Sequence, residues 1–337
     1  MSKKQVEANL LLMLTAMIWG FAFVAQRVGS ETMGPFAFNG IRFAIGALTL
    51  LPVIYFIEKS EARNRIAAED GCSQAVSAED AKIAHKALML RKYPVKAGII
   101  CGLILFSGAS LQQFGIFFTT AGKTGFITAL YIVLVPVFGI FLKHKVTLNA
   151  WIGVALATVG LYLLCITESI TISLGDFVIL IGAGFWAAHI LVINHYAGKV
   201  SALRLSCMQF AIVSAVSLIV ALFVEEISLA SIQLTLVPIL YSGILSSGVA
   251  FTLQIVGQKN APPTLASIIL SMEAVFGALG GWLLLGEMLS SRELTGCAIM
   301  FAAIVISQLP GGSPGFWKSR RVLSTQEKEG VHFENRG

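Results

Sequence analysis

Long apolar segments, separated by short polar ones, dominate the chain. Ten of them are about 20 residues long, the length that a helix needs to cross a bilayer: 8–28, 34–57, 96–118, 122–142, 147–166, 174–195, 202–224, 235–256, 263–285 and 290–309. They are continuously apolar, without the alternation of an outer-membrane β-strand. Because a lipid-exposed backbone must satisfy its own hydrogen bonds, the pattern predicts an all-α integral membrane protein with ten transmembrane helices.

Two polar segments are expected to lie outside the membrane. Residues 58–95 form a charged loop, in which 78–92 is a candidate helical stretch, and residues 310–337 form a polar tail. The first apolar segment follows Lys3 and Lys4, as a secretion signal does, but its apolar core is too long for a signal peptide. We therefore expect a retained first helix.

The basic residues are distributed asymmetrically. If the N-terminus is cytoplasmic, most of the 24 Lys and Arg residues fall on the cytoplasmic side of the membrane, as the positive-inside rule requires. The outer loops carry acidic residues instead, namely Glu31, Glu168, Glu225 and Glu226. The distribution predicts that both termini, with the loop 58–95 and the tail 310–337, lie in the cytoplasm.

Composition supports a membrane protein and excludes other classes. The mean hydropathy is +0.81, and only 12% of the residues are charged, against about 25% in a soluble domain. A cytosolic enzyme, a disordered protein and a collagen-like chain are therefore excluded. The net charge of +6 does not indicate a nucleic-acid partner, because the basic residues lie between apolar segments and not on one face of a soluble module.

The cysteine and histidine patterns predict no disulfide, no metal site and no cofactor. Four of the five cysteines lie inside apolar segments, where a small buried apolar side chain is the ordinary role. None belongs to a CxxC pair, and the five histidines form no HExxH-like pair.

The chain contains an internal repeat. Two motifs recur at an offset of 167 residues: Ala16-x-x-Trp19-Gly20 as Ala183-x-x-Trp186-Ala187, and Arg42-Phe43-Ala44 as Gln209-Phe210-Ala211. Farther along the offset falls to 140, which aligns Gly108 with Gly248 and Ala121 with Ala261, because the loop 58–95 lengthens the first half. The chain is thus predicted to contain two five-helix repeats, 8–166 and 174–309. Since five is odd, the second repeat is inverted, an architecture that suits alternating access.

Two charges lie at membrane depth, where each costs at least about 2.5–3.5 kcal/mol and therefore needs a reason. Glu273 is a candidate ligand for a substrate amine, or a group that binds and releases a proton; the alternative is a structural partner for a group across the bundle. Arg42 could bind a carboxylate or phosphate in bidentate fashion. Its alternatives are an interhelical salt bridge, Glu273 being one candidate partner, and snorkelling to the interface.

Aromatic and amide side chains complete the candidate substrate site. Trp19 and Trp186 occupy matching repeat positions midway along their segments, where they could form the walls of a cavity or only pack against a neighbouring helix. His189 lies one turn from Trp186 and could titrate near neutral pH, or it could only form a hydrogen bond to a neighbouring helix. The other candidates are polar side chains whose alternative role is interhelical hydrogen bonding: Gln112, Gln113, Tyr131, Gln209 and Gln254.

Several motifs resemble a known family. The segments Leu14–Gly20, Arg42-Phe43 and Tyr131–Pro136 resemble the first half of EamA-type carriers of the drug/metabolite transporter superfamily, and Ser271–Phe276 with Trp282–Glu287 resembles their second half. The resemblance implies a ten-helix secondary carrier of small organic solutes, often an exporter of amino acids or related metabolites, in a bacterial plasma membrane. Family members usually have Glu-Pro in the ninth helix, whereas this chain has Glu273-Ala274, so the sequence does not impose a bend there.

We therefore predict a secondary active transporter that moves a small metabolite by alternating access. Its partners would be the solute, the bilayer and, as a candidate coupling ion, a proton, with no nucleic acid; the oligomeric state stays open. An intramembrane enzyme and a channel-like facilitator are the alternatives. No Walker-type motif, paired catalytic base or filter-like repeat favours either alternative or direct coupling to ATP.

Overall fold

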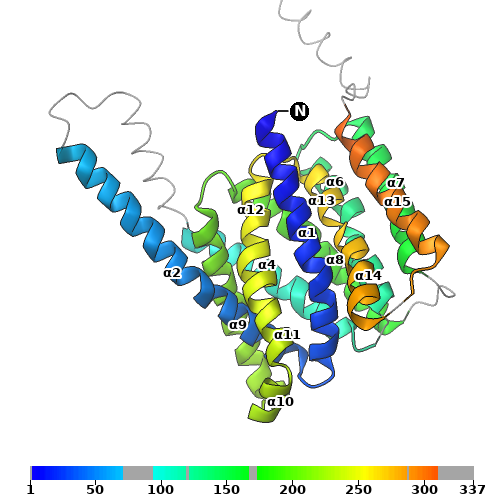
Figure 1. The fold of residues 1–337 in the computed structure, drawn as a ribbon, viewed down its shortest axis with the longest axis horizontal. Coiled ribbons are helices and arrows are strands. Elements are labelled where there is room, and N and C mark those ends of the chain that lie inside the picture. Colours follow the sequence, from blue (N-terminus) through cyan, green and yellow to red (C-terminus); the bar gives the residue numbers. More distant parts are fainter. Residues whose placement is uncertain (1, 71–93, 119–120, 167–172, 287, 310–337) are drawn as a thin grey trace, which may run out of the picture.

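The computed structural model describes residues 2–70, 94–118, 121–166, 173–286 and 288–309, and within these ranges every regular element is helical (Figure 1). In chain order the elements are α1 (Lys3–Ser30), α2 (Pro35–Asp70), α4 (Pro94–Gly115), α5 (Ala121–Ala129), α6 (Tyr131–Phe141), α7 (Leu148–Cys165), α8 (Leu174–Tyr196), α9 (Ala202–Val224), α10 (Leu229–Leu234), α11 (Leu236–Leu240), the π-helix η1 (Tyr241–Phe251), α12 (Thr252–Gln258), α13 (Pro263–Leu270), α14 (Glu273–Leu285) and α15 (Ser291–Gln308). The prediction of an all-α chain is confirmed for the part that the structure describes.

The surface of the bundle has the character of a membrane protein. Eight helices or helix pairs in the described ranges are long and apolar enough to cross a membrane, and the apolar segment Leu148–Leu164 is shorter. Large apolar side chains point outward all around them: Phe141 is 80% exposed, Leu222 75% and Phe223 85%. A soluble monomer rarely exposes so continuous an apolar surface, whereas a lipid-facing surface requires one. The chain is a multi-pass membrane protein.

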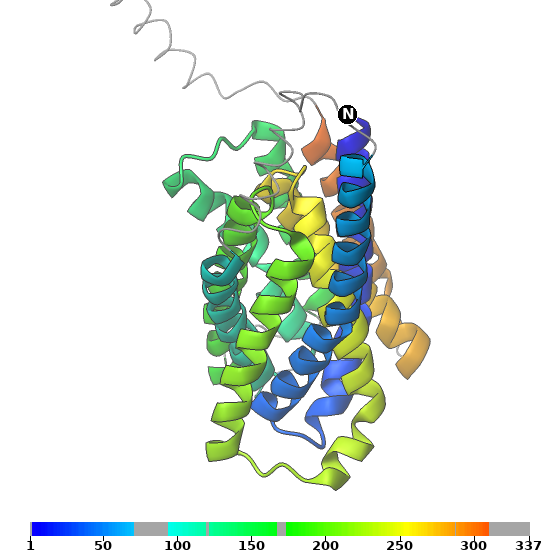
Figure 2. The ribbon, with the colours of Figure 1, turned by 90° about the vertical axis from the view of Figure 1, so that its left-hand side faces the viewer.

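The first and last described helices, α1 and α15, meet at one end of the bundle. The side-chain amide of Asn9 in α1 donates a hydrogen bond of 3.0 Å to Oε1 of Gln308, the last residue of α15. Figure 2 shows the start of α1 at the opposite end of the bundle from the connection between α9 and α10.

One polar segment departs from the prediction. The predicted loop begins at residue 58, but α2 continues as a helix to Asp70 and projects from the bundle (Figure 1). The prediction was therefore wrong for residues 58–70. Residues 94 and 95, at the other end of the predicted loop, already belong to α4. Residues 71–93, with the candidate helix at 78–92, and the tail 310–337 lie outside the described residues.

Two predicted membrane segments are broken helices. Segment 122–142 is α5 and α6, separated at Leu130, and segment 263–285 is α13 and α14, separated at Ser271 and Met272. At both breaks the backbone tightens from i−4 to i−3 hydrogen bonds, from Leu130 N–H to the Ile127 carbonyl and from Met272 N–H to the Ile269 carbonyl. The break before Glu273 therefore forms without the proline that is usual in the resembled family.

A third predicted segment, 235–256, contains the π-helix η1, which is 11 residues long and continues into α12. π-Helices usually occur as single turns inside α-helices and are frequent at functional sites. The sequence of this segment, which contains Gly243 and Gly248, gave no sign of the altered register.

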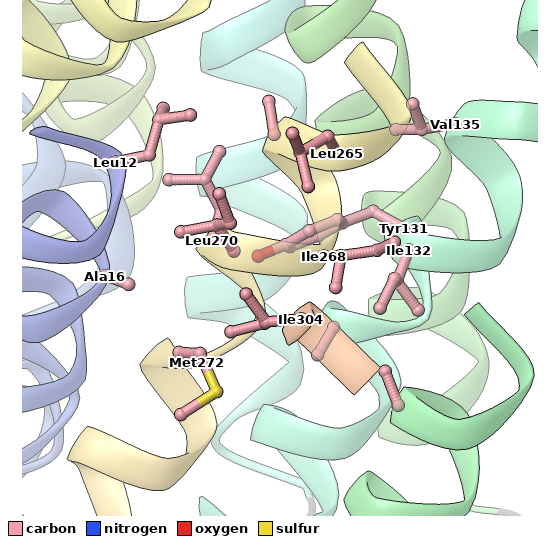
Figure 3. Packing of buried hydrophobic residues seen from close by; sticks show 14 of the residues in the cluster. Leu12, Ala16, Tyr131, Ile132, Val135, Leu265, Ile268, Leu270, Met272 and Ile304 are labelled. Carbon is pink, nitrogen blue, oxygen red and sulfur yellow. The ribbon is translucent and has the colours of Figure 1, made fainter. Parts of the chain in front are cut away.

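Helix packing pairs the elements in a regular way. The closest neighbours are α7 with α15, α2 with α9 and η1, α4 with α8 and α9, and α1 with α14, η1 and α12. A buried apolar cluster joins α1, α6, α13 and α14 close to both helix breaks, and Figure 3 shows Leu12, Tyr131, Leu270 and Met272 within it. The breaks are therefore held by core packing and do not lie on the lipid-facing surface.

Candidate functional site

A cavity lies between the broken helices and the first helices of the two halves. Its walls come from α1, α2, α4, α8, η1, α12 and the residues at the breaks. Seven of the ten predicted site residues line it: Trp19, Arg42, Gln112, Tyr131, Trp186, Gln254 and Glu273. These residues are far apart in the sequence, and the fold brings them to one place.

Glu273 contributes the negative group. Its side chain is 5% exposed, and its Oε1 accepts a hydrogen bond of 3.0 Å from the hydroxyl of Tyr131, which is 3% exposed. Glu273 is the first residue of α14, where the positive end of the helix dipole favours a carboxylate. The helix break therefore places Glu273 at the cavity wall and also makes its burial less costly.

Arg42 contributes the positive group. Its Nε donates a hydrogen bond of 3.0 Å to Oδ1 of Asn39, one turn earlier in α2. The guanidinium carbon lies 4.7 Å from the ring centroid of Phe43 and 5.7 Å from that of Phe38. In the described part of the chain no ion pair joins Arg42 to Glu273, so the predicted alternative of a salt bridge between them is wrong for this conformation. Snorkelling also fails as an explanation, because Arg42 is only 4% exposed.

The aromatic walls converge on Phe251, the last residue of η1. Its ring centroid lies 4.6 Å from that of Trp19 and 6.2 Å from that of Trp186, with which it is stacked. Phe251 and both tryptophans line the cavity. The two repeat-equivalent tryptophans therefore lie near one aromatic ring, which separates the cavity from the core.

The other three predicted residues do not line the cavity. His189 and Gln209 are fully buried, and Nε2 of His189 lies 3.0 Å from Oε1 of Gln209, an interhelical hydrogen bond between α8 and α9. The His189 ring packs 6.0 Å from the ring of Phe251. Gln113 is 1% exposed and also lies away from the cavity. The alternative of interhelical hydrogen bonding thus fits the His189–Gln209 pair.

Sequence reasoning missed several lining residues. Phe23 and Ile190 are separated by the repeat offset of 167, and each lies one turn beyond a tryptophan, so the repeat could have identified them. Phe251 gave no such signal, because its direction depends on the π-helical register of η1. The further lining residues that were missed are polar: Gln26, Thr128 and Ser246.

The chemistry of the site is that of binding. One carboxylate, one guanidinium, several amides and hydroxyls, and five aromatic rings line the same pocket. Among the residues that the structure describes, no group of three His, Cys, Asp or Glu side chains could hold a metal ion. The arrangement can bind a small organic molecule that carries both charge and apolar surface.

Comparison with known proteins identifies the family. The model of the EamA-like transporter family matches residues 7–166 and 173–308. An uncharacterized transporter of Archaeoglobus fulgidus is 29% identical over 91% of this chain and 87% of its own length. The uncharacterized transporter YoaV of Bacillus subtilis is 22% identical over 90% of this chain and 97% of its own length.

The fold also has a solved counterpart. A crystal structure with 17% sequence identity superimposes with a TM-score of 0.69, covering 90% of this chain and 96% of the other. The family match spans almost all of the described bundle, and the names of the relatives describe transporters and not enzymes. The resemblance seen in the helix motifs is thereby confirmed, and the chain belongs to the EamA-like transporter family.

Proposed function

We propose that this protein is a secondary active transporter that moves an amino acid or a related small metabolite, in the export direction, across the plasma membrane by alternating access. It would cross the membrane ten times as two inverted five-helix repeats, with both termini in the cytoplasm. The observation that carries the proposal is a cavity in which Glu273 and Arg42 both lie without forming an ion pair with each other.

The centre of the α2–α9 contact supports the inverted repeat. The rings of Phe43 in α2 and Phe210 in α9 lie 5.6 Å apart, and these two residues are separated by the repeat offset of 167. A residue touches its own repeat equivalent when it lies near a twofold axis that relates the repeats. The Phe43–Phe210 contact is therefore expected if a pseudo-twofold axis passes between α2 and α9.

Two hydrogen bonds across the α2–α9 contact join residue pairs that are related to each other by the repeat offset. The Ser214 hydroxyl in α9 donates to the Gly40 carbonyl in α2 at 2.9 Å, and the Cys207 thiol donates to the Ala47 carbonyl at 3.7 Å. Gly40 aligns with Cys207 and Ala47 with Ser214 at the offset of 167. The two residue pairs are therefore equivalent by repeat symmetry, although the donor lies in α9 in both bonds.

At each end of the α2–α9 contact, a glutamate in or directly after one helix accepts hydrogen bonds from the start of the other helix, an arrangement that we call a carboxylate clamp. The Glu225 carboxylate accepts from the backbone N–H groups of Phe36 at 2.8 Å and Ala37 at 2.7 Å, at the start of α2. Glu58, its equivalent at the offset of 167, accepts from Nε of Arg204 at 2.9 Å, at the start of α9. The clamps lie at opposite ends of the contact, as inverted repeats require.

The cavity supports a substrate with two opposite charges and an apolar body. A carboxylate buried beside a tyrosine hydroxyl is suited to an ammonium group, and a guanidinium is suited to a carboxylate. The rings of Trp19, Trp186 and Phe251 offer apolar surface between the polar groups. A zwitterion with an apolar side chain matches all three features.

A proton is the proposed coupling ion. Glu273 can carry either a proton or the substrate ammonium, and a carboxyl that alternates between them couples the two fluxes in opposite directions. Export would then use proton entry. A competition of this kind needs no group other than Glu273 to titrate.

The decisive experiment is solute counterflow in proteoliposomes that contain only the purified chain. We expect saturable exchange of an amino acid that is stimulated by a pH gradient, with much weaker exchange of the corresponding amine and methyl ester, each of which lacks one charge. Glu226→Gln, at an exposed loop position, is the matched control for carboxylate variants. Solute turnover without flux would indicate an enzyme, and conductance that follows voltage without counterflow would indicate a channel; either result would overturn the proposal.

A further inference from the structure

The two halves differ in the register of one helix. Residues 241–251 form the π-helix η1, whereas their repeat equivalents at the offset of 140, residues 101–111, lie inside the regular α-helix α4. A π-helix closes its hydrogen-bonded ring one residue later than an α-helix, so it turns carbonyls and side chains in new directions. The segments otherwise occupy corresponding places, η1 against α1 and α4 against α8.

Helix α1 is bonded directly to the π-helical segment. The indole Nε1–H of Trp19 donates to the Ser246 carbonyl at 3.2 Å, and the Thr15 hydroxyl donates to the Ala250 carbonyl at 3.2 Å. In return the Tyr241 hydroxyl donates to the Ile18 carbonyl of α1 at 3.1 Å. A carbonyl can accept a second bond beside its helical one when its direction permits.

In the other half, the equivalent tryptophan makes no hydrogen bond like that of the Trp19 indole. Trp186 aligns with Trp19, and its indole packs against Gly108, whose repeat equivalent at the offset of 140 is Gly248. The buried Nε1 of Trp186 has no protein hydrogen-bond acceptor among the described residues. An unsatisfied buried N–H is costly. The Trp19 indole N–H is therefore satisfied by a carbonyl of the π-helix. The Trp186 indole N–H faces the regular α-helix α4 and has no such acceptor.

We propose that the π-helical register is the switch of the transport cycle and that it alternates between the two halves. This inference rests on the proposed inverted-repeat transport mechanism. In the opposite state, residues 101–111 take the π-helical register and the carbonyl of Phe106, the equivalent of Ser246, accepts the Trp186 indole N–H. Residues 241–251 then become α-helical and release Trp19.

The exchange conserves the indole bond but not every contact. Each state has one satisfied and one unsatisfied indole, and one π-helical and one α-helical segment, whereas the Thr15 and Tyr241 bonds favour the present state, because their repeat equivalents are Gly182 and Cys101. A ligand that binds the opposite state more tightly can offset this difference. Because Trp19, Trp186, Ser246 and Phe251 also line the cavity, the switch lies in contact with the proposed substrate.

The test compares two matched substitutions. Trp19→Phe removes the indole bond of the present state, and Trp186→Phe removes the bond expected in the opposite state, while both retain an aromatic ring. The two variants should therefore shift the conformational equilibrium in opposite directions. Trp282→Phe, at a side chain that is 47% exposed, is the control and should shift nothing.

The readout is the labelling rate of a Gln26→Cys reporter, in a chain whose native cysteines are replaced by serine, with a membrane-impermeant maleimide added outside vesicles. We expect one tryptophan variant to label about fivefold faster than the parent and the other about fivefold slower, which corresponds to about 1 kcal/mol. The double variant Trp19→Phe/Trp186→Phe should return to within about twofold of the parent. Shifts in the same direction, no shift, or a double variant far from the parent would overturn the switch.

The assay needs no substrate, so a protein that moves no solute but shows opposite shifts would refute the proposed function alone.

Discussion

The Tyr131 hydroxyl donates a hydrogen bond of 3.0 Å to Oε1 of Glu273, and each residue begins the second part of a broken helix. Tyr131 follows the break between α5 and α6, and Glu273 follows the break between α13 and α14. The hydrogen bond therefore joins corresponding points of the two halves. It holds the carboxylate at the cavity wall through a neutral donor, which leaves the charge of Glu273 uncompensated by any cation in the described ranges.

Glu273→Gln should abolish the response of transport to an imposed pH gradient. The amide keeps the size of the side chain and can still accept the Tyr131 hydrogen bond, but it carries neither a proton nor a negative charge for an ammonium group. Counterflow in proteoliposomes at several external pH values measures the effect, and we expect exchange to fall at least about tenfold. If the variant kept the parent's pH response, Glu273 would not be the coupling group.

Tyr131→Phe tests whether the position of the Glu273 carboxylate matters separately from its charge. It removes the hydroxyl but not the carboxylate, so the protein should still respond to a pH gradient while its apparent KM for substrate rises. The loss of one hydrogen bond to a charged group, about 1.5–3 kcal/mol, predicts an increase of roughly tenfold or more. A variant that lost the pH response while its KM stayed unchanged would contradict a purely positioning role.

Arg42→Lys should impair binding although it conserves charge. The planar guanidinium is held between the Asn39 amide oxygen and the faces of Phe38 and Phe43, and a lysine ammonium cannot reproduce both the fork and the stacking. We expect KM for a zwitterionic substrate to rise about tenfold. Arg27→Lys, at an exposed position in the last turn of α1, is the control. Equal KM values in the two variants would show that Arg42 does not bind the substrate.

The sequence predicted much of the fold because hydropathy and the repeat depend on composition and spacing. Eight of the ten predicted apolar segments coincide, in the described part of the chain, with helices that are long and apolar enough to cross a membrane. The offset of 167 also matches the contact between Phe43 and Phe210. Local register was harder to predict. The break before Glu273 has no proline, and η1 has no distinctive residue, so tertiary packing decides both. The loop prediction failed at residue 58 because α2 extends beyond its apolar segment.

The site was predictable where an unusual residue type marked it. Glu273, Arg42 and the two tryptophans are rare at membrane depth, and all four line the cavity. Amides are less informative, because an amide inside a helix bundle serves equally well in a cavity wall or in an interhelical bond. Gln254 therefore lines the cavity, while Gln209 bonds to His189.

Glu225→Gln should destabilise the start of α2. The carboxylate of Glu225 accepts two backbone N–H groups that have no partner inside the helix, as an N-terminal cap does. Replacing it by an amide leaves one acceptor oxygen and a neutral group, at a cost of about 1 kcal/mol. We expect a lower midpoint of thermal unfolding in detergent than for Glu226→Gln, the neighbouring exposed residue. Equal midpoints would show that the clamp contributes nothing.

Gly20→Ala should damage both stability and transport. A Cβ at Gly20 would lie 2.5 Å from the Cβ of Phe276 and 2.7 Å from the carbonyl oxygen of Glu273, so α1 and α14 would have to separate at the helix break. Overpacking of this kind costs about 1–3 kcal/mol. Gly184→Ala in α8 is the control, because its Cβ would meet no atom within 4 Å and alanine favours the helix by up to about 1 kcal/mol. Thermal unfolding in detergent should therefore place Gly20→Ala below the parent and Gly184→Ala at or above it. Counterflow should fall only in Gly20→Ala, since only that substitution moves the backbone that positions Glu273. Parent-like exchange by Gly20→Ala would mean that the close approach of α1 to α14 is not needed for transport.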